Sequence, residues 1–176
     1  MKKFYTLFLV GLFFYSANGQ SSIFSYGSSW KYLDNGTNPG TAWTGTGFSD
    51  ASWLSGVGQF GYGDGDEATV VSYGPSATTK YITTYFRKTI SIASTAAFSN
   101  FTANVKRDDG IIVYINGVER YRNNIAAGTV TYTTLATNAS DDGATQQTFT
   151  IATGSFVNGN NTIAVEIHQS AANSSD

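Results

Sequence analysis

The stretch Asp108-Asp109-Gly110-Ile111-Ile112-Val113-Tyr114-Ile115-Asn116-Gly117-Val118-Glu119-Arg120-Tyr121-Arg122 decides the fold class. A run of β-branched and aromatic residues precedes Asn116-Gly117, and a second strand-like run follows it. Asn-Gly supplies the two positive-φ residues that a type I′ turn needs, and the twist of this turn matches that of the flanking strands. The stretch therefore predicts an antiparallel hairpin.

The first strand of this hairpin is apolar on both faces. Ile111, Val113 and Ile115 share one face, whereas Ile112 and Tyr114 share the other, because successive side chains of a strand alternate. A strand with two apolar faces is covered on both sides. We therefore expect it to lie inside a sheet rather than at its edge.

The rest of the chain repeats the strand pattern. Alternation of apolar and polar residues predicts strands over 101–106 and 162–168, and a further strand over 83–92 whose inner face Lys88 interrupts. One helical turn is expected at 49–53, where Ser49 or Asp50 can cap the start. The longest loop is expected from 61 to 79. No stretch has a sustained helical period, so the sequence predicts an all-β, antiparallel β-sandwich.

The amino terminus has the features of a secretory signal. Met1-Lys2-Lys3 is followed by an apolar stretch over 4–15 that is too short to span a bilayer, and small residues stand at Ala17 and Gly19. We predict a signal peptide over 1–19 with cleavage after Gly19, and a secreted or cell-surface location. Residues 20–176 are then expected to form a single domain.

Charge and cysteine content exclude several function classes. Without Lys2 and Lys3 the chain carries eight Lys and Arg residues against twelve Asp and Glu residues, a formal charge of −4. The cations are scattered, so nucleic acid and anionic membranes are not expected partners. The absence of cysteine excludes disulfides, thiolate metal sites and a cysteine nucleophile. No second apolar run is long enough for membrane insertion.

Several motifs occur in an order that resembles a known family. They are Trp30-Lys31-Tyr32-Leu33-Asp34, Phe48-Ser49-Asp50-Ala51-Ser52-Trp53, Gly61-Tyr62-Gly63, Tyr85-Phe86-Arg87-Lys88, and Arg107-Asp108-Asp109-Gly110 through Tyr114-Ile115-Asn116-Gly117. Together they resemble galactose-binding-like jelly-roll modules of secreted multidomain bacterial proteins, especially those of Bacteroidetes. Similar modules precede the catalytic domains of secreted glycoside hydrolases and metallophosphoesterases.

The resemblance implies a non-catalytic accessory role beside downstream domains of the same polypeptide. Chains of this kind continue after the equivalent of Asn173-Ser174-Ser175-Asp176 with one more apolar strand. We therefore expect this chain to be a fragment that lacks the last strand of its jelly roll. An unpaired sheet edge at that place would favour pairing with another chain.

The sequence offers few catalytic groups. The sole histidine, His168, lies two residues after Glu166 on one predicted strand, so both side chains share a face. They could bind a metal or relay a proton, but a structural role among neighbouring polar groups is favoured. Arg87 is expected to pair with a carboxylate such as Glu166. We assign no catalytic residue.

Calcium is the metal that the residues allow. The resemblance implies a structural calcium ion that uses Asp34 with backbone carbonyls, and a likeness to protective-antigen-like adhesin domains implies one at Asp108 and Asp109. The alternative for this pair is turn chemistry before the hairpin. Asp64, Asp66 and Glu67 also cluster, but their spacing does not fit an EF-hand.

Carbohydrate binding is the leading functional hypothesis. Sugar rings stack on exposed aromatic side chains, and carboxylates bond their hydroxyls. Trp30 and Trp53 are expected to close the ends of the sandwich, whereas Trp43 and Tyr73 are expected to be exposed. The predicted ligand-binding residues are Trp43, Tyr73, Asp64 and Asp66. The alternative is a structural spacer before a downstream hydrolase such as a metallophosphoesterase.

Overall fold

The computed structural model describes residues 20–174, so the predicted signal peptide lies outside the described residues. The strands are β1 (Ser29–Leu33), β2 (Leu54–Val57), β3 (Phe60–Gly61), β4 (Thr69–Val70), β5 (Thr83–Ile92), β6 (Phe101–Val105), β7 (Gly110–Ile115), β8 (Val118–Asn123), β9 (Gln147–Ile151) and β10 (Gly159–His168). Three short 3₁₀ helices are η1 (Ala42–Thr44), η2 (Thr95–Ala97) and η3 (Thr153–Ser155). Within 20–174, no helix is long and apolar enough to cross a membrane. The all-β prediction is confirmed.

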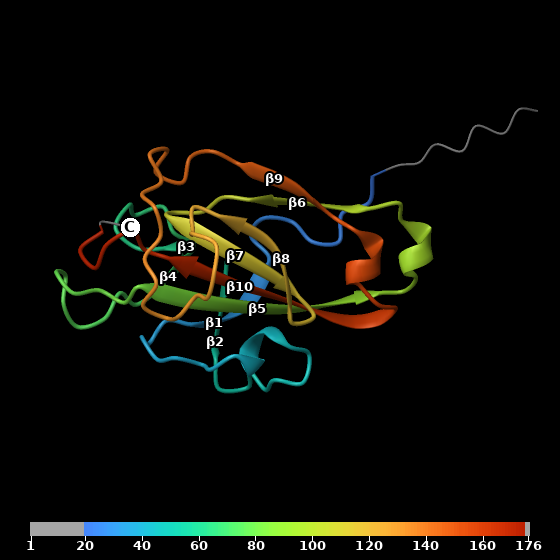
Figure 1. Ribbon diagram of the computed structural model, residues 1–176, viewed down its shortest axis with the longest axis horizontal. Coiled ribbons are helices and arrows are strands. Elements are labelled where there is room, and N and C mark those ends of the chain that lie inside the picture. The colour runs from blue at the N-terminus through green and yellow to red at the C-terminus, as the bar shows by residue number, and fades with distance from the viewer. Residues whose placement is uncertain (1–19, 175–176) are drawn as a thin grey trace, which may run out of the picture.

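The largest sheet is antiparallel and has the strand order β2-β1-β5-β10-β7-β8 (Figure 1). Its two ten-residue strands, β5 and β10, pair along their whole length. The predicted hairpin joins β7 to β8, and the φ angles of 52° at Asn116 and 87° at Gly117 fit the expected turn. The expectation that β7 lies inside the sheet is also confirmed, since β10 and β8 flank it.

A second layer covers one face of this sheet, which we call the inner face. β6 pairs with β9, and Figure 1 shows these two strands stacked over the large sheet. Side chains from both layers meet in the main apolar core, which includes Ile90, Ile92, Phe101, Ile111, Val113, Ile115, Ile151, Phe156 and Ile163. Burial of such side chains away from water is the main stabilising contribution to folding. The two layers confirm an antiparallel β-sandwich.

A loop over 42–53 covers the opposite face, which we call the outer face. Trp43 and Trp53 pack there against Tyr85 of β5 and Ala164 of β10. The indole of Trp53, at the end of this loop, therefore packs on the outer face and does not close an end of the sandwich as predicted. The expected helical turn at 49–53 is a hydrogen-bonded turn in which the Trp53 amide donates to the Asp50 carbonyl at 3.0 Å.

The guanidinium group of Arg87 fastens this loop to the sheet. It is buried on β5, its Nε donates to Asp50 Oδ2 at 2.9 Å, and its terminal nitrogens donate to the carbonyls of Trp43, Gly45 and Phe48. The expected pairing of Arg87 with Glu166 is wrong. The loop brings one carboxylate and three carbonyls to Arg87, and no local sequence pattern predicts these contacts.

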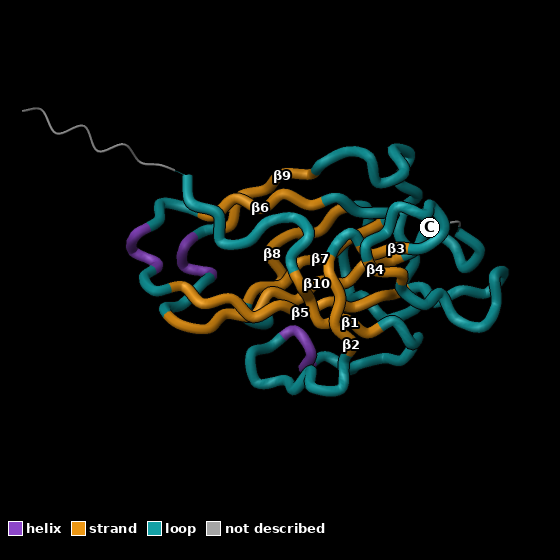
Figure 2. The backbone as a smooth tube through the Cα atoms, turned by 180° about the vertical axis from the view of Figure 1, so that it is seen from behind, coloured by secondary structure: helices purple, strands orange, loops and turns teal. Residues whose placement is uncertain are grey.

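The predicted loop over 61–79 is shorter than expected because β4 lies within it. β3 and β4 pair in parallel, in contrast to the other ladders of the described chain. Their flanking residues Tyr62 and Val71 pack with Tyr32 and Phe86 on the inner face, beside the main core. Figure 2 shows η2 and η3 side by side at one end of the molecule, with η1 apart from them next to the large sheet.

Candidate functional site

An exposed tyrosine beside a lysine is the first candidate for ligand binding. Tyr62 follows β3 and Tyr73 follows β4, and their ring centroids lie 5.2 Å apart. The Nζ atom of Lys80 lies 4.8 Å from the Tyr62 ring centroid and 5.3 Å from that of Tyr73. Tyr62 is buried, whereas Tyr73 is 38% exposed. We call Tyr62, Tyr73 and Lys80 the tyrosine–lysine surface.

The loop between β3 and β4 carries the predicted acidic residues. Glu67 accepts hydrogen bonds from the amides of Asp64 and Gly65, at 3.0 Å each. Hydrogen bonds from its own amide and from the Asp64 amide lower the pKa of Glu67. Asp66 accepts a hydrogen bond from Gln59, while the exposed Asp64 carboxylate forms no hydrogen bond or ion pair with another residue of 20–174. Glu67 therefore shapes the loop and leaves Asp64 facing solvent.

The structure separates Trp43 from the other predicted binding residues. Its ring is only 4% exposed and lies 4.9 Å from the ring of Tyr85 and 5.7 Å from that of Tyr114, measured between centroids. Trp43 thus belongs to the outer face, whereas the Tyr73 ring packs at a tilt against Tyr62 beside the inner face. The expected exposure of Trp43 is wrong, because the loop held by Arg87 turns the indole into the protein.

The aspartates predicted to hold calcium form separate contacts with backbone amides. Asp34 Oδ2 accepts from the Ser72 amide at 2.6 Å, and Asp109 accepts from the amides of Ala139 and Ser170. The half-buried Asp108 directly precedes Asp109 before the hairpin. Within residues 20–174, no three or more His, Cys, Asp or Glu side chains gather in a group that could hold a metal ion. Calcium binding stays a prediction.

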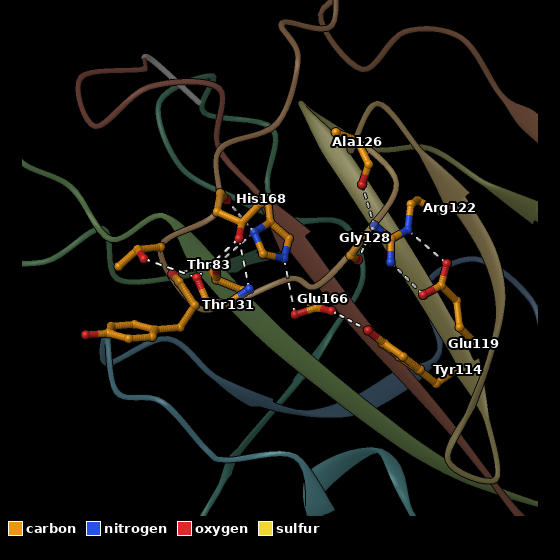
Figure 3. Close-up of polar contacts among 12 residues, drawn as sticks. Thr83, Tyr114, Glu119, Arg122, Ala126, Gly128, Thr131, Glu166 and His168 are labelled. Carbon is orange, nitrogen blue, oxygen red and sulfur yellow. Dashed lines mark hydrogen bonds and ion pairs between the residues drawn. The ribbon is translucent and has the colours of Figure 1, made fainter.

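The histidine and its neighbours form a buried polar cluster on the outer face (Figure 3). His168 is fully buried, and its Nε2 atom lies 3.2 Å from Glu166 Oε2. The Tyr114 hydroxyl donates to Glu166 Oε1 at 2.6 Å. On the other side of the ring, Nδ1 lies 2.8 Å from the Thr134 carbonyl and 3.0 Å from the Thr83 hydroxyl. Because a carbonyl oxygen only accepts, Nδ1 carries a hydrogen.

Burial and the charge of Glu166 act together on the nearby phenols. Burial raises the pKa of Tyr114, and its hydrogen bond to Glu166 raises that pKa further. Burial also raises the pKa of Tyr85, with the negative charge of Glu166 as the second cause. Both phenols therefore keep their protons at neutral pH, and Tyr114 serves as a hydrogen-bond donor.

A loop over 124–137 closes this cluster from the solvent. The Thr137 amide donates to the backbone carbonyl of Asn124 at 2.7 Å, and the Ala136 amide donates to that of Gln169 at 3.0 Å. Arg122 forms a two-point ion pair with Glu119 and also donates to the carbonyls of Ala126 and Gly128, as Figure 3 shows. A hollow of about 130 Å³ reaches Thr83 but is not lined by Glu166 or His168. The loop and the ion pair thus keep the cluster away from this hollow, and a structural role for Glu166 and His168 stays a prediction.

Replacing Tyr114 by phenylalanine is expected to lower the free energy of unfolding by about 2 kcal/mol, because a buried carboxylate loses a donor. Urea denaturation followed by circular dichroism measures the change. Tyr121→Phe on β8 is the matched control, since the Tyr121 hydroxyl forms no hydrogen bond with a residue of 20–174 and its ring stacks on Phe149. Equal losses in the two variants would contradict a specific role for the Tyr114 hydroxyl.

The sequence reasoning missed Lys80 and did not select Tyr62 from the aromatic residues in or near loops. Lys80 stands outside any motif, and only the approach of the residues before β5 to β3 and β4 places its ammonium over two rings. Tyr62 was one aromatic residue among several candidates. The strand pattern around Tyr62 is too short to reveal its partner, because β3 and β4 each have two residues.

No protein-family model matches the sequence, and a search of curated proteins finds no match. The fold is similar to parts of solved glycosidases. One is a calcium binding mutant of Bacteroides uniformis beta-glucuronidase 2, with a TM-score of 0.54, 18% identity, and coverage of 82% of this chain and 14% of that chain. Another is a Bacteroides vulgatus beta-glycosidase, with a TM-score of 0.52, 15% identity, and coverage of 81% and 16%.

A glycosyl hydrolase family 2 member from Bacteroides cellulosilyticus is a third, with a TM-score of 0.50, 17% identity, and coverage of 82% of this chain and 17% of that chain. The chain thus corresponds to 14 to 17% of the length of these proteins. The likeness extends over most of the described residues and concerns the fold. This chain has the fold of a β-sandwich domain that occurs within larger glycoside hydrolases.

Proposed function

We propose that this chain is a non-catalytic accessory domain of a larger secreted protein and that it binds carbohydrate through the tyrosine–lysine surface. The observation that carries the proposal is the exposed ring of Tyr73, backed by Tyr62 and flanked by the Lys80 ammonium. An aromatic ring held in this way offers an apolar plane to a sugar, and nearby polar groups fix its hydroxyls.

The β3–β4 loop, which begins at Tyr62, carries exposed hydrogen-bond acceptors. The exposed carboxylates of Asp64 and Asp66 follow Tyr62 closely in the sequence, and Glu67 holds the backbone of their loop. Sugar hydroxyls donate to carboxylates through charge-assisted hydrogen bonds. Tyr73, Asp64 and Asp66 therefore remain in the proposed site, while the buried Trp43 does not contribute a stacking surface.

The polar groups of the outer face support the non-catalytic part of the proposal. Catalysis by His168 and Glu166 would need access for a substrate. His168 is fully buried, and Glu166 is 5% exposed and already bonded to Tyr114. Their burial under the loop over 124–137 keeps both groups away from a substrate.

Replacing Tyr73 by alanine is expected to weaken binding to a soluble polysaccharide about tenfold, which corresponds to ~1.4 kcal/mol of binding free energy. Affinity gel electrophoresis against plant, algal and bacterial polysaccharides finds the ligand, and isothermal titration measures the loss. Tyr26→Ala is the matched control, because Tyr26 is 61% exposed and bonds Gln146 rather than a residue of the surface. Thermal melting of both variants checks that they fold.

The same experiment decides between binding and the spacer role. A spacer without a ligand is favoured by the burial of Trp43, which leaves Tyr73 as the one exposed aromatic ring of the four predicted binding residues. If the folded domain shows no detectable binding to any of the polysaccharides, the result supports the spacer role. Equal loss of binding in Tyr73→Ala and Tyr26→Ala would place the site away from the tyrosine–lysine surface.

A further inference from the structure

Three Asn-Gly pairs lie in the described part of the chain, and their asparagine side chains have different surroundings. They are Asn35-Gly36, Asn116-Gly117 and Asn158-Gly159. In such a pair the backbone amide of the glycine can attack the side-chain carbonyl carbon of the asparagine, because glycine has no side chain to obstruct the approach. The reaction closes a succinimide ring and releases ammonia. The surroundings of each asparagine therefore decide how fast it is modified.

The side chain of Asn35 folds back over the backbone that follows it. Its Oδ1 atom accepts hydrogen bonds from the Thr37 amide at 3.1 Å and from the Thr37 hydroxyl at 2.6 Å. Such an Asx-turn closes a ring that runs from the asparagine side chain through the backbone of the next residue. The carbonyl carbon of the Asn35 side chain is therefore held beside the peptide group of Gly36.

The hydrogen bonds of this turn favour the attack. As the succinimide ring closes, negative charge develops on Oδ1 of Asn35, and donors that already point at this atom stabilise the charge. Within 20–174, neither the Gly36 amide nor the Asn35 Nδ2 atom forms a hydrogen bond. Asn35 is also exposed, so water can accept the proton of the attacking nitrogen and supply one to the leaving nitrogen.

Asn116 has the opposite arrangement, although it also precedes a glycine. Its Nδ2 atom donates to the Ser155 carbonyl at 3.2 Å and to Asn161 Oδ1 at 2.8 Å. Its Oδ1 atom accepts from the Thr162 amide at 2.9 Å. Both hydrogens of the leaving nitrogen are thus bonded to the protein, and ammonia cannot depart before these bonds break. We therefore expect Asn116 to be protected.

Asn158 is exposed, but a different segment holds its side chain. Its Oδ1 atom accepts from the Thr95 amide at 2.8 Å and from the Thr95 hydroxyl at 3.2 Å. These bonds direct the carbonyl to η2 and not to the backbone that follows Asn158. Gly159 begins β10 and is paired with Ile92 of β5. Because ring closure requires the glycine amide and the asparagine side chain to approach each other, both constraints oppose it.

We propose that Asn35 is a site of self-modification, where the folded chain converts asparagine to aspartate and isoaspartate faster than at Asn116 or Asn158. The Gly36 nitrogen loses its proton and forms a bond to Asn35 Cγ, and the Cγ–Nδ2 bond then breaks with the loss of ammonia. Water next opens the succinimide ring. Opening at the side-chain carbonyl gives aspartate, and opening at the backbone carbonyl gives isoaspartate.

The site goes beyond the proposed function, because the reaction needs no ligand. Modification replaces a neutral amide by a carboxylate and so adds one negative charge to the turn after β1. Gly36 and Thr37 of this turn line the same hollow as Lys80. A chain modified at Asn35 therefore carries a new charge beside the hollow that reaches the tyrosine–lysine surface at Lys80.

The test follows the three pairs together in the full chain, kept at mildly alkaline pH either in native buffer or in concentrated urea. Peptide mass spectrometry measures the conversion at each asparagine, and an isoaspartyl methyltransferase measures isoaspartate. In urea we expect similar rates at the three pairs, because their surroundings are lost. In native buffer we expect Asn35 to react at least about tenfold faster than Asn116 and Asn158 and no more slowly than in urea. Its products should include isoaspartate, which direct hydrolysis of the side chain does not give.

A pair of valine variants tests the role of the Thr37 hydroxyl. Thr37→Val removes this donor, keeps a branched side chain, and is expected to slow the reaction at Asn35 in native buffer at least about threefold. Thr41→Val is the matched control, because Thr41 is exposed and its side chain forms no capping hydrogen bond. Thermal melting checks that both variants fold. Equal rates at the three pairs in native buffer, or equal effects of the two variants, would overturn the proposal.

Discussion

Replacing Asp109 by alanine is expected to lower the free energy of unfolding by about 4 kcal/mol, because two buried amides lose a charged acceptor. Asp109 is 1% exposed, and its two carboxylate oxygens bind different segments. Oδ1 accepts from the Ala139 amide at 2.8 Å, and Oδ2 accepts from the Ser170 amide at 2.6 Å. One side chain before β7 thus ties a distant loop to the residues that follow β10.

Urea denaturation measures this loss of stability. Asp109→Asn separates the contributions of the two carboxylate oxygens. Asparagine keeps one acceptor oxygen and turns the other into a donor that faces an amide, so an intermediate stability is expected. Asp64→Ala, at an exposed carboxylate, is the control and should change stability by less than 0.5 kcal/mol. If Asp109→Ala lowers the free energy of unfolding no more than Asp64→Ala does, the Ala139 and Ser170 amides must have other hydrogen-bond acceptors.

Replacing Arg87 by methionine is expected to lower the free energy of unfolding by about 3 kcal/mol and to loosen the loop over 42–53. Methionine fills much of the space of the arginine stem but donates no hydrogen bond. The carbonyls of Trp43, Gly45 and Phe48 then lose their donor, and Asp50 loses its ion pair. Asp50 is partly exposed, so water recovers some of the cost.

The tryptophans report the release of this loop. Trp43 and Trp53 belong to this loop, and their indoles are buried against the sheet. In Arg87→Met their emission should shift to longer wavelength, and acrylamide should quench it more strongly, before global unfolding. Arg120→Met, at an exposed position of β8, is the control and should leave the emission unchanged. An unchanged emission spectrum together with reduced stability would show that Arg87 does not hold the loop in place.

The sequence predicted those parts of the fold that local chemistry determines. Asn116 and Gly117 identify the hairpin because few other residues tolerate two successive positive φ angles. The alternation around Ile163 and Val165 identifies β10 because successive side chains of a strand point to opposite faces. The polar face was expected to lie in water, but Thr162, Glu166 and His168 are buried as well. β2, β3 and β4 remained hidden, since two to four residues are too few to show a period.

The candidate site was harder to predict because its residues meet through long-range folding. Trp43, with its Gly and Thr neighbours, has the composition of an exposed loop, and only its contact with Tyr85 shows that the indole is buried. Arg87 lies on a face with Glu166, but its partner Asp50 comes from the other end of a folded loop. By contrast, the shared face of Glu166 and His168 follows directly from their spacing and is confirmed.

The place of β10 in the sheet has a consequence for the order of folding during synthesis. β5 and β7 both pair with β10, and they do not pair with each other, so residues 159–168 stand between two halves of the sheet. A growing chain that has not yet reached residue 159 has a β7–β8 hairpin and a β1–β5 pairing with no strand to join them. Because β10 is the last strand to be synthesised, the two halves of the large sheet cannot join until β10 has left the ribosome.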